Sequence, residues 1–345
     1  MRLRGAERLQ KAWRKACGII SPGPVILLYH RVDDLTTDPQ LLSVSPAHFE
    51  EHLALLKKSY NIMRLEDMVT SVLKGNVPKR AVAITFDEGY ADNYKYAWPL
   101  LKKYSMPATI YVTTGYVSAN REFFCDELER LILRSDNLPE VLNLEIAGKH
   151  YEWRLAAPCK KDVSRHKDSW NILAADNPSP AHQAYRELHR ILHSQPYREQ
   201  ERALEKIRSA TGDDGSARQT HLAMSWEQIR EIAADGLVDI GAHTVTHAFL
   251  SSLSKNEQQS EIAGSIQAIE SCTKKRVTSF AYPYGTRRSY DANTLAILKA
   301  AGIANAASNF RSRLSSNTDH FQLPRLVVRN CPGNVFKQFL KKNAL

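Results

Sequence analysis

The sequence predicts an α/β protein built around a parallel β-sheet. Short apolar runs such as Val25–Tyr29, Ala81–Phe86 and Ala108–Thr113 have the length and the β-branched content of buried strands. Segments with helical spacing, including Leu65–Lys74 and Tyr94–Tyr104, lie between these runs. Polar or turn-forming residues follow several strands directly, and this carboxyl-end edge is where α/β folds place their sites.

Two adjacent carboxylates end the strand Ala81–Phe86. Asp87 and Glu88 are followed by Gly89, which can turn the chain, and by Tyr90. A carboxylate is costly to bury unless it is paired or bound to a cation. The pair therefore indicates either a site that holds a cation or, in the simpler interpretation, the start of a solvated loop.

Two histidines four residues apart follow another apolar strand, Val238–Ala242. If a helical turn begins after Ala242, His243 and His247 lie on one face of that turn. Two imidazoles and a carboxylate form a three-ligand set for a divalent metal, with one position open for water. Such a histidine pair also occurs by chance on surface helices, but the acidic strand end makes a metal site the stronger interpretation.

A third strand, Ser279–Ala281, runs into a turn formed by Pro283, Tyr284 and Gly285. Taken alone, this is an ordinary turn, because proline and glycine are common turn residues.

Together the three segments resemble the polysaccharide deacetylases, the NodB-like carbohydrate esterases. Thr85–Tyr90 resembles the Thr-Phe-Asp-Asp-Gly-Tyr motif of that family, His243–His247 its His-[Ser/Thr]-x-x-His motif, and Ala281–Tyr284 its Arg-x-Pro-[Tyr/Phe] motif. The resemblance covers residues 23–117 and 222–330, in the order that the family uses. It implies a distorted (β/α) barrel of the NodB-homology type, with a metal at the carboxyl-end face.

The resemblance also implies a role for each residue of the site. Glu88, His243 and His247 are expected to hold a divalent ion, with zinc the expected metal. Asp87 is expected to act as the general base that takes a proton from the attacking water, and the backbone N–H of Tyr284 to help hold the oxyanion. The implied reaction hydrolyses an N-acyl group, acetyl above all, from an amino sugar in a glycan or glycan precursor, as in exopolysaccharide biosynthesis.

His30 directly follows the first strand. It resembles the general acid of the poly-N-acetylglucosamine deacetylase branch, which protonates the departing amine. A core or capping histidine is the alternative.

Two positions depart from the family pattern. Glu88 stands where the family has Asp and is one methylene longer, so either the ion is shifted or Glu88 does not ligate it directly. Ala281 stands where the family has an Arg that orients the catalytic Asp. Arg325, near a late strand, is expected to supply that charge instead, and the poly-N-acetylglucosamine branch also lacks the Arg at the earlier position.

The ranges covered by the family resemblance also set the expected domain boundaries. We expect a basic segment over residues 1–20, a deacetylase barrel formed by residues 21–117 and 222–345, and an inserted α+β cap over residues 118–221. The cap contains a predicted hairpin and two predicted helices, Ala181–His193 and Tyr197–Arg208. A second metal site is a weaker interpretation of the cap histidines His182, His189 and His193, because no carboxylate ends a strand beside them.

Composition and charge bear on partners and location. The chain has 345 residues, 43% of them apolar, and no apolar run of about 18 residues that would span a membrane. Its five cysteines are scattered, which favours a reducing compartment, and no signal peptide is recognised, so we expect a cytoplasmic protein. The net charge of +10 lies in residues 1–20 and 311–345, and the middle of the chain is close to neutral. This distribution argues against nucleic acid as a partner.

The basic ends have two interpretations. They either form a face that contacts an anionic membrane peripherally, with Leu9 and Trp13 at the lipid interface, or they only aid solubility.

Two other functions stay open. One is an amidohydrolase of the same fold that acts on a formyl, carbamoyl or cyclic amide group. The other is a non-catalytic glycan-binding homologue, which would need neither the metal ligands nor the base.

Overall fold

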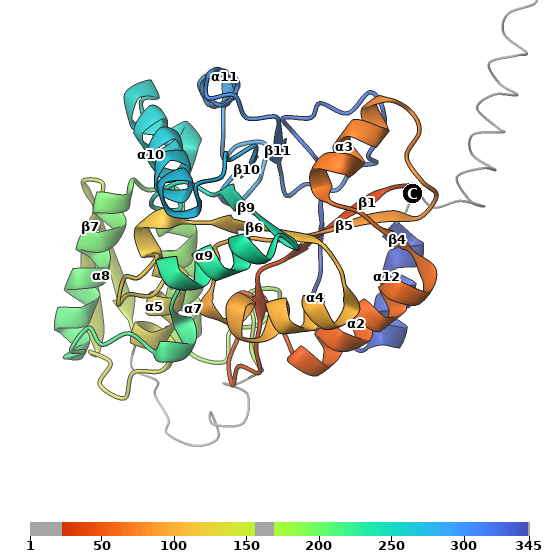
Figure 1. Cartoon of the computed structure of the whole chain (residues 1–345). Helices are drawn as coiled ribbons and strands as arrows, with labels where there is room; N and C mark the ends of the chain where they lie inside the picture. Colours follow the sequence, from red (N-terminus) through yellow and green to blue (C-terminus); the bar gives the residue numbers. More distant parts are fainter. Residues whose placement is uncertain (1–22, 156–168, 344–345) are drawn as a thin grey trace, which may run out of the picture.

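The core of the protein is one curled parallel sheet, seen near the centre of Figure 1. The computed structural model describes residues 23–155 and 169–343. Seven strands follow one another across the sheet in the order β11-β10-β9-β6-β5-β1-β12, all parallel, and β4 pairs with the start of β5. Their bounds are Val25–Tyr29 (β1), Asn61–Ile62 (β4), Ala81–Phe86 (β5), Ala108–Val112 (β6), Val238–Ala242 (β9), Ser279–Ala281 (β10), Asn305–Ala307 (β11) and Leu326–Val327 (β12). The predicted parallel sheet is therefore confirmed.

The two edges of this sheet meet through the segment 323–327. Leu323 pairs in parallel with Ala307 of β11, and Leu326 pairs with Leu27 of β1. The backbone N–H of Leu323 donates to the carbonyl oxygen of Ala306 at 2.9 Å. Because one short segment contacts both edges, the sheet curls into the distorted (β/α) barrel that the sequence predicts.

Side chains alternate between the inside and the outside of this barrel, as the twofold repeat of a strand requires. In β5, Val82, Ile84 and Phe86 pack outward into the main hydrophobic cluster, whereas Ala81 and Ala83 belong to a separate inner cluster. Small residues inside leave room for large buried side chains at the centre of the barrel. The same alternation points Thr85 and Asp87 inward.

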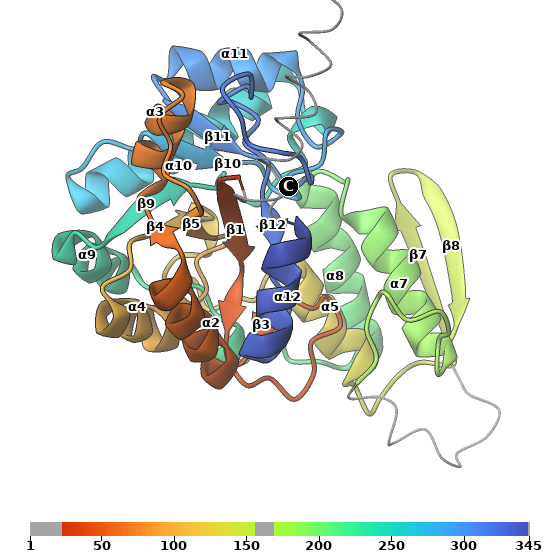
Figure 2. The ribbon, with the colours of Figure 1, turned by 90° about the vertical axis from the view of Figure 1, so that its right-hand side faces the viewer.

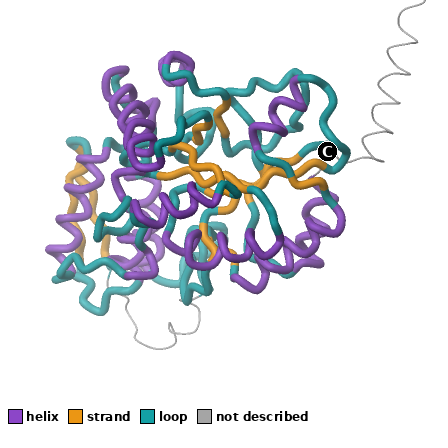
Figure 3. Tube along the Cα trace, viewed as in Figure 1, coloured by secondary structure: helices purple, strands orange, loops and turns teal. Residues whose placement is uncertain are grey.

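Helices cover the outside of the barrel and close its amino end (Figures 2 and 3). They are α2 (Pro46–Ser59), α3 (Leu65–Leu73), α4 (Trp98–Tyr104), α9 (Trp226–Asp235), α10 (Lys255–Thr273), α11 (Ala292–Ala300) and α12 (Gly333–Asn343). Helix α2 begins as expected, because Ser45 accepts a hydrogen bond from the N–H of His48 and Pro46 occupies the first turn. Helix α3 packs Leu65 and Met68 against the inner cluster.

Short elements complete the barrel. They are β2 (Arg31–Val32), β3 (Ser43–Val44), the π-helical turn η1 (Asn93–Ala97) and the 3-10 turns η2 (Thr114–Tyr116), η3 (Gln219–His221) and η4 (Leu250–Ser252). Strands β2 and β3 pair with each other in parallel, outside the main sheet.

The described residues of the segment 118–221, which are 118–155 and 169–221, build a unit beside the barrel, at the left of Figure 1. It consists of α5 (Phe124–Leu133), the antiparallel hairpin β7 (Val141–Ile146) and β8 (Lys149–Arg154), α7 (Pro180–Leu192) and α8 (Tyr197–Thr211). The predicted hairpin and both predicted helices are present. This unit has its own cluster of buried side chains, which supports our proposal that it is a cap inserted into the barrel.

No helix within the described ranges is long and apolar enough to cross a membrane. The basic segment 1–20, with Leu9 and Trp13, lies outside the described residues.

Candidate active site

The acidic pair at the end of β5 is held in a buried turn. Asp87 and Glu88 are 4% and 7% exposed, which excludes the solvated-loop interpretation. The N–H of Asp87 donates to the carbonyl oxygen of Tyr29 at 3.1 Å. Glu88 has a φ of 66°, a left-handed conformation that non-glycine residues seldom adopt, and Gly89 follows with a φ of 78°. This turn sends the two neighbouring carboxylates in different directions.

Asp87 points into the barrel, where Arg325 lies. The Arg325 guanidinium donates from Nη1 to Oδ1 at 2.7 Å and from Nη2 to Oδ2 at 2.6 Å. Arg325 is 2% exposed and also donates from Nε to the carbonyl oxygen of Ser308 at 2.9 Å. Arg325 thus lies beside Asp87, where it was expected from the sequence to supply a positive charge.

The two predicted histidine ligands lie on a loop after β9. The conditional expectation of a helical turn after Ala242 is wrong, because Thr244 and His247 have φ values of 65° and 60° and no helix forms there. Glu261 of α10 holds this loop instead: its carboxylate accepts the N–H groups of Val245 and Thr246, each at 2.9 Å.

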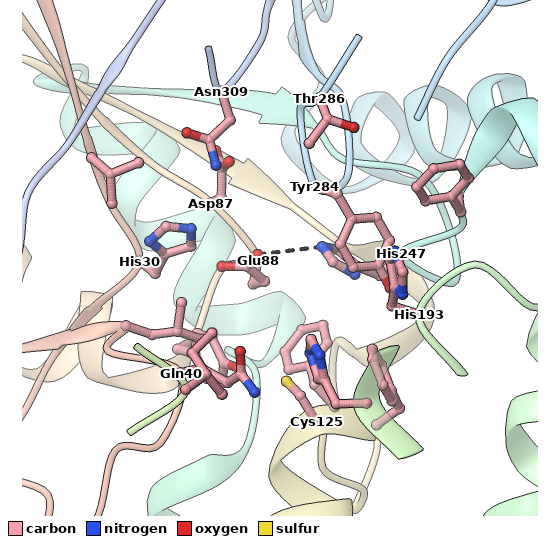
Figure 4. Close-up of a pocket in the computed structure, with 18 of the residues that line it drawn as sticks. His30, Gln40, Asp87, Glu88, Cys125, His193, His247, Tyr284, Thr286 and Asn309 are labelled. Atoms are coloured by element: carbon pink, nitrogen blue, oxygen red, sulfur yellow. Dashed lines mark ion pairs between the residues drawn. The ribbon is translucent and has the colours of Figure 1, made fainter. Parts of the chain in front are cut away.

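Glu88, His243 and His247 converge in spite of that difference. Glu88 Oε1 lies 3.8 Å from Nε2 of His243 and 3.3 Å from Nε2 of His247. One ligand atom from each of the three residues lies within 4.8 Å of the other two. Figure 4 shows Glu88 and His247 facing one another across the site.

The hydrogen bonding around this cluster fits a metal ion. Nδ1 of His243 donates to the carbonyl oxygen of Ala281 at 2.7 Å, so Nε2 keeps its lone pair for a ligand. Oε2 of Glu88 and Nε2 of both histidines are buried and have no hydrogen-bond partner in the part of the chain that the structure describes. Buried polar atoms are rarely left unpaired, and two imidazole nitrogens with one carboxylate are a usual donor set for zinc. These residues therefore fit a divalent ion.

Charge also favours an anionic Glu88. Burial alone would raise the pKa of Glu88, but the neighbouring His30, His243 and His247 outweigh that effect and hold this pKa well below its usual value. A carboxylate must be deprotonated to ligate a metal.

His30 lies at the end of β1, across the site from His247 (Figure 4). It is 8% exposed, and its Nδ1 has no hydrogen-bond partner among the described residues. Burial lowers the pKa of His30, while the negative charges of Glu88 and Asp87 oppose that effect. An unpaired imidazole nitrogen beside the acidic pair is available to a bound molecule.

Tyr284 is carried by the turn after β10. Its φ is 61°, and its ring lies 4.8 Å from the ring of His247. Gly285 has a φ of 58°, and a Cβ atom there would lie 2.4 Å from the backbone nitrogen of Asn309. The turn therefore requires glycine, both for its backbone angle and for its contact with the loop after β11.

A cavity of about 310 Å³ opens above these residues. His30, Asp87, Glu88, His247 and Tyr284 line its barrel side. The unit 118–221 supplies the opposite wall, with Phe123, Phe124, Cys125, Ile172, His189 and His193. Gln40, Leu42, Tyr90, Phe249, Thr286, Asn309, Val327 and Arg329 complete the lining. The site is thus a mostly apolar pocket with polar groups gathered at its floor, as ligand pockets usually are.

A family model described as polysaccharide deacetylase matches residues 74–152 and 177–306, more than half of the chain. The chain belongs to the polysaccharide deacetylase family. The resemblance found in the three motifs is thereby confirmed.

Curated relatives match this member of the family over a shorter stretch. A poly-beta-1,6-N-acetyl-D-glucosamine N-deacetylase from Staphylococcus aureus strain MSSA476 is 40% identical over 76 residues, which is 22% of this chain and 26% of the relative. The chain therefore spans about a quarter of the length of that relative in the match.

Solved structures agree with the fold over almost the whole chain. The deacetylase PplD of Streptococcus pyogenes, in complex with acetate, superposes with a TM-score of 0.56 at 17% identity and covers 93% of this chain and 99% of its own. IcaB from Ammonifex degensii gives a TM-score of 0.55 at 18% identity, over 94% and 98% of the two chains. At these identities the likeness concerns the fold.

Sequence reasoning missed the cavity wall that faces Glu88 and His247. His189 and His193 share a helical stripe, which was interpreted only as a weak second metal site, yet they line the active-site cavity, and the ring of His193 lies 5.6 Å from the ring of Tyr284. Burial and the neighbouring His193 lower the pKa of His189 to about 4. The helical spacing of the two residues was visible in the sequence, but the docking of α7 against the barrel loops was not. Asn309 and Arg329 were missed for the same reason.

Proposed function

We propose that this family member is a metal-dependent hydrolase that removes an N-acyl group, in the first place acetyl, from an amino sugar. The observation that carries the proposal is the convergence of Glu88, His243 and His247, with unpaired ligand atoms, directly beside the buried Asp87–Arg325 pair. The family of the chain and the name of its S. aureus relative support the same chemistry.

Asp87 is the proposed general base. Arg325 fixes the plane of its carboxylate from inside the barrel, and each carboxylate oxygen keeps a second lone pair for a water molecule at the cavity floor. Glu88, His243 and His247 would hold a divalent ion, whose positive charge would polarise the acyl carbonyl and make water easier to deprotonate.

His30 and Tyr284 act on the substrate in this proposal. His30 lies across the site from His247 and gives a proton to the nitrogen of the departing amine as the C–N bond breaks. The backbone N–H of Tyr284, in the turn fixed by Gly285, donates to the oxyanion. Water is consumed, and the products are a carboxylate and a free amino sugar.

Product analysis tests this function. The purified protein, loaded with zinc, is incubated with a panel of N-acetylated and N-formylated amino sugars and short glycans, and both the released acid and the new amine are measured. We expect equal amounts of acetate and amine from at least one acetylated member. Release of formate alone would favour the formyl hydrolase, and release from no member would contradict the proposal.

Metal content is the second test. We propose about one divalent ion per chain, with zinc favoured by the two-imidazole, one-carboxylate donor set. Elemental analysis should find it in the wild type and not in His243→Ala. An unchanged metal content in that variant would contradict the site.

A peripheral membrane contact on the cytoplasmic side stays a proposal. Helix α12 presents Lys337, Lys341 and Lys342 to solvent, and the segment 1–20 adds six Lys or Arg. Each basic residue near an anionic bilayer contributes about 1 kcal/mol. Binding to anionic liposomes should therefore be seen at low salt, fall at high salt, and drop when residues 1–20 are removed. Protein that stays in the supernatant at low salt would exclude the contact.

A further inference from the structure

Arg329 places a positive charge in the wall of the active-site cavity. It is partly buried, and its Nη1 donates to the carbonyl oxygens of Gln40, at 3.0 Å, and Leu41. Within the described ranges, no carboxylate oxygen lies within the 4.0 Å of an ion pair with Arg329. Asp38 is the acid that acts on it from further away, and the Asp38 carboxylate accepts the N–H groups of Leu42 and Ser43.

The other charges of the cavity are already matched. Asp87 is paired with Arg325, and Glu88 faces the two histidines of the metal site. Arg329 therefore remains as a cation whose Nε and Nη2 donors are not used by the described part of the protein. Burying part of a guanidinium without a carboxylate is unfavourable, and a bound anion would relieve that cost.

Further positive charge lies in two loops that also contribute residues to the cavity lining. Thr286 and Asn309 line the cavity (Figure 4), and exposed arginines follow them in the loops after β10 and β11. The backbone N–H of Asn309 donates to the carbonyl oxygen of Gly285 at 2.7 Å, so the two loops lie side by side. The exposed arginines are Arg287, Arg288, Arg311 and Arg313, and none of them forms an ion pair with a described residue.

Two acidic residues near these loops accept hydrogen bonds from backbone N–H groups. Asp291 caps α11 by accepting the N–H of Thr294, and Asp319 accepts the N–H of Phe321. The two loops therefore carry exposed positive charge, and Arg329 adds a further positive charge in the cavity wall.

We propose that the substrate carries a phosphate group next to its N-acyl sugar, and that Arg329 binds this phosphate inside the cavity. The planar guanidinium of arginine matches phosphate oxygens and makes strong charge-assisted hydrogen bonds with them. The arginines of the two loops raise the local concentration of such an anion. This inference rests on the proposed function, because that function places the N-acyl group beside Asp87. The shared chemistry is a glycosyl phosphate or diphosphate, whose other end is a nucleoside or a lipid.

Binding measured without turnover tests the proposal. Calorimetric titrations compare N-acetylglucosamine 1-phosphate with N-acetylglucosamine on zinc-loaded protein that carries Asp87→Asn, a substitution expected to keep the metal and remove turnover. In these titrations the wild type is the protein with Arg329 intact in that background. We expect the phosphorylated sugar to bind about tenfold more tightly or better, as one charged hydrogen-bond pair allows. The preference should be lost in Arg329→Gln and largely kept in Arg329→Lys. Equal affinity of the wild type for the two sugars, or no binding of the phosphorylated sugar at millimolar concentration, would overturn the proposal.

Controls separate Arg329 from the metal and from a structural role. Arg276→Gln removes an exposed arginine before β10, at the opposite end of the barrel, and should keep the preference. If Arg329 only held the loop at Gln40 and Leu41, Arg329→Gln would lower the affinity for both sugars by the same factor. If the phosphate bound the metal, the preference would vanish on zinc removal and survive in Arg329→Gln. Either result contradicts the proposal.

Two further measurements keep the test independent of variant folding and of activity. In the wild type, raising the salt concentration should weaken binding of the phosphorylated sugar several-fold and leave binding of the neutral sugar unchanged. Parallel titrations with a nucleoside-diphosphate sugar and a short prenyl-diphosphate sugar identify the carrier. A protein that releases acyl groups from neutral sugars without preferring phosphate would refute this inference and leave the proposed function intact.

Discussion

Arg325 and Asp87 are 238 residues apart in the chain, yet two hydrogen bonds of 2.7 and 2.6 Å join them at the centre of the barrel. Arg325 precedes β12, which closes the barrel, and Asp87 follows β5. Both side chains are almost completely buried. The pair therefore couples the closure of the barrel to the geometry of the proposed general base.

Removing one member of this pair should be strongly destabilising. Arg325→Gln leaves a buried carboxylate without its cation, which typically costs about 3–5 kcal/mol. Urea unfolding measures the loss. Arg64→Gln is the matched control, because it breaks the exposed Arg64–Asp239 pair and should cost about 1 kcal/mol at most. Similar losses in the two variants would show that burial of the Arg325 pair is not decisive.

The neighbouring carboxylates should respond differently to the same substitution. Glu88→Gln is expected to lower metal affinity by about tenfold or more, because an amide is a weaker ligand than a carboxylate. Asp87→Asn should keep the metal and reduce turnover by at least about a hundredfold, because the proposed base is lost. Metal titration and acyl release measure the two effects. If they were exchanged between the variants, the assigned roles would be reversed.

Gly285→Ala tests the turn that carries Tyr284. The new Cβ would lie 2.4 Å from the backbone nitrogen of Asn309, so the turn must move. We expect kcat to fall about tenfold or more with metal content unchanged, because small displacements of catalytic groups are costly. Gly148→Ala in the β7–β8 turn is the control: its φ of 74° is similar, but nothing lies within 4 Å of the added Cβ. A kinetic loss of the same size in the control would mean that backbone strain alone is responsible.

Stability should fall in acid partly through His52. Its Nε2 donates to the carbonyl oxygen of Cys331 at 2.7 Å, and Nδ1 lies 3.2 Å from the hydroxyl of Tyr29. Burial lowers the pKa of His52 from 6.5 to about 4. The unfolded chain therefore binds more protons between these values, so this contribution is complete above pH 6.5 and is lost as the pH falls toward 4. Its upper limit is about 3 kcal/mol.

Urea unfolding at several pH values checks this sign. His52→Gln, which cannot titrate, should show a shallower loss of stability between pH 6.5 and 4 than the wild type. His150→Gln changes an exposed histidine of β8 and should retain the wild-type slope. A wild-type slope in His52→Gln would show that other groups cause the acid sensitivity.

The sequence by itself determined the fold class and the family. Apolar runs of strand length, the turn chemistry after β5 and β10, and the order of the three motifs depend on local spacing, which a linear chain displays directly. For the same reason the sequence was sufficient to select Asp87, Glu88, His243 and His247 as candidates, since each directly follows a strand or lies within the turn after it.

Only the tertiary structure decided how those residues meet and what surrounds them. The loop after β9 is not helical, because Glu261 of α10 binds its N–H groups and stabilises an irregular backbone. His193 and Arg329 reach the cavity because a helix of the unit 118–221 and the segment after β12 pack against the barrel. Such contacts join residues far apart in the chain, and they depend on which surfaces pack together. Local spacing carries no information about that choice, so the sequence predicted the residues at the floor of the cavity and the structure supplied its walls.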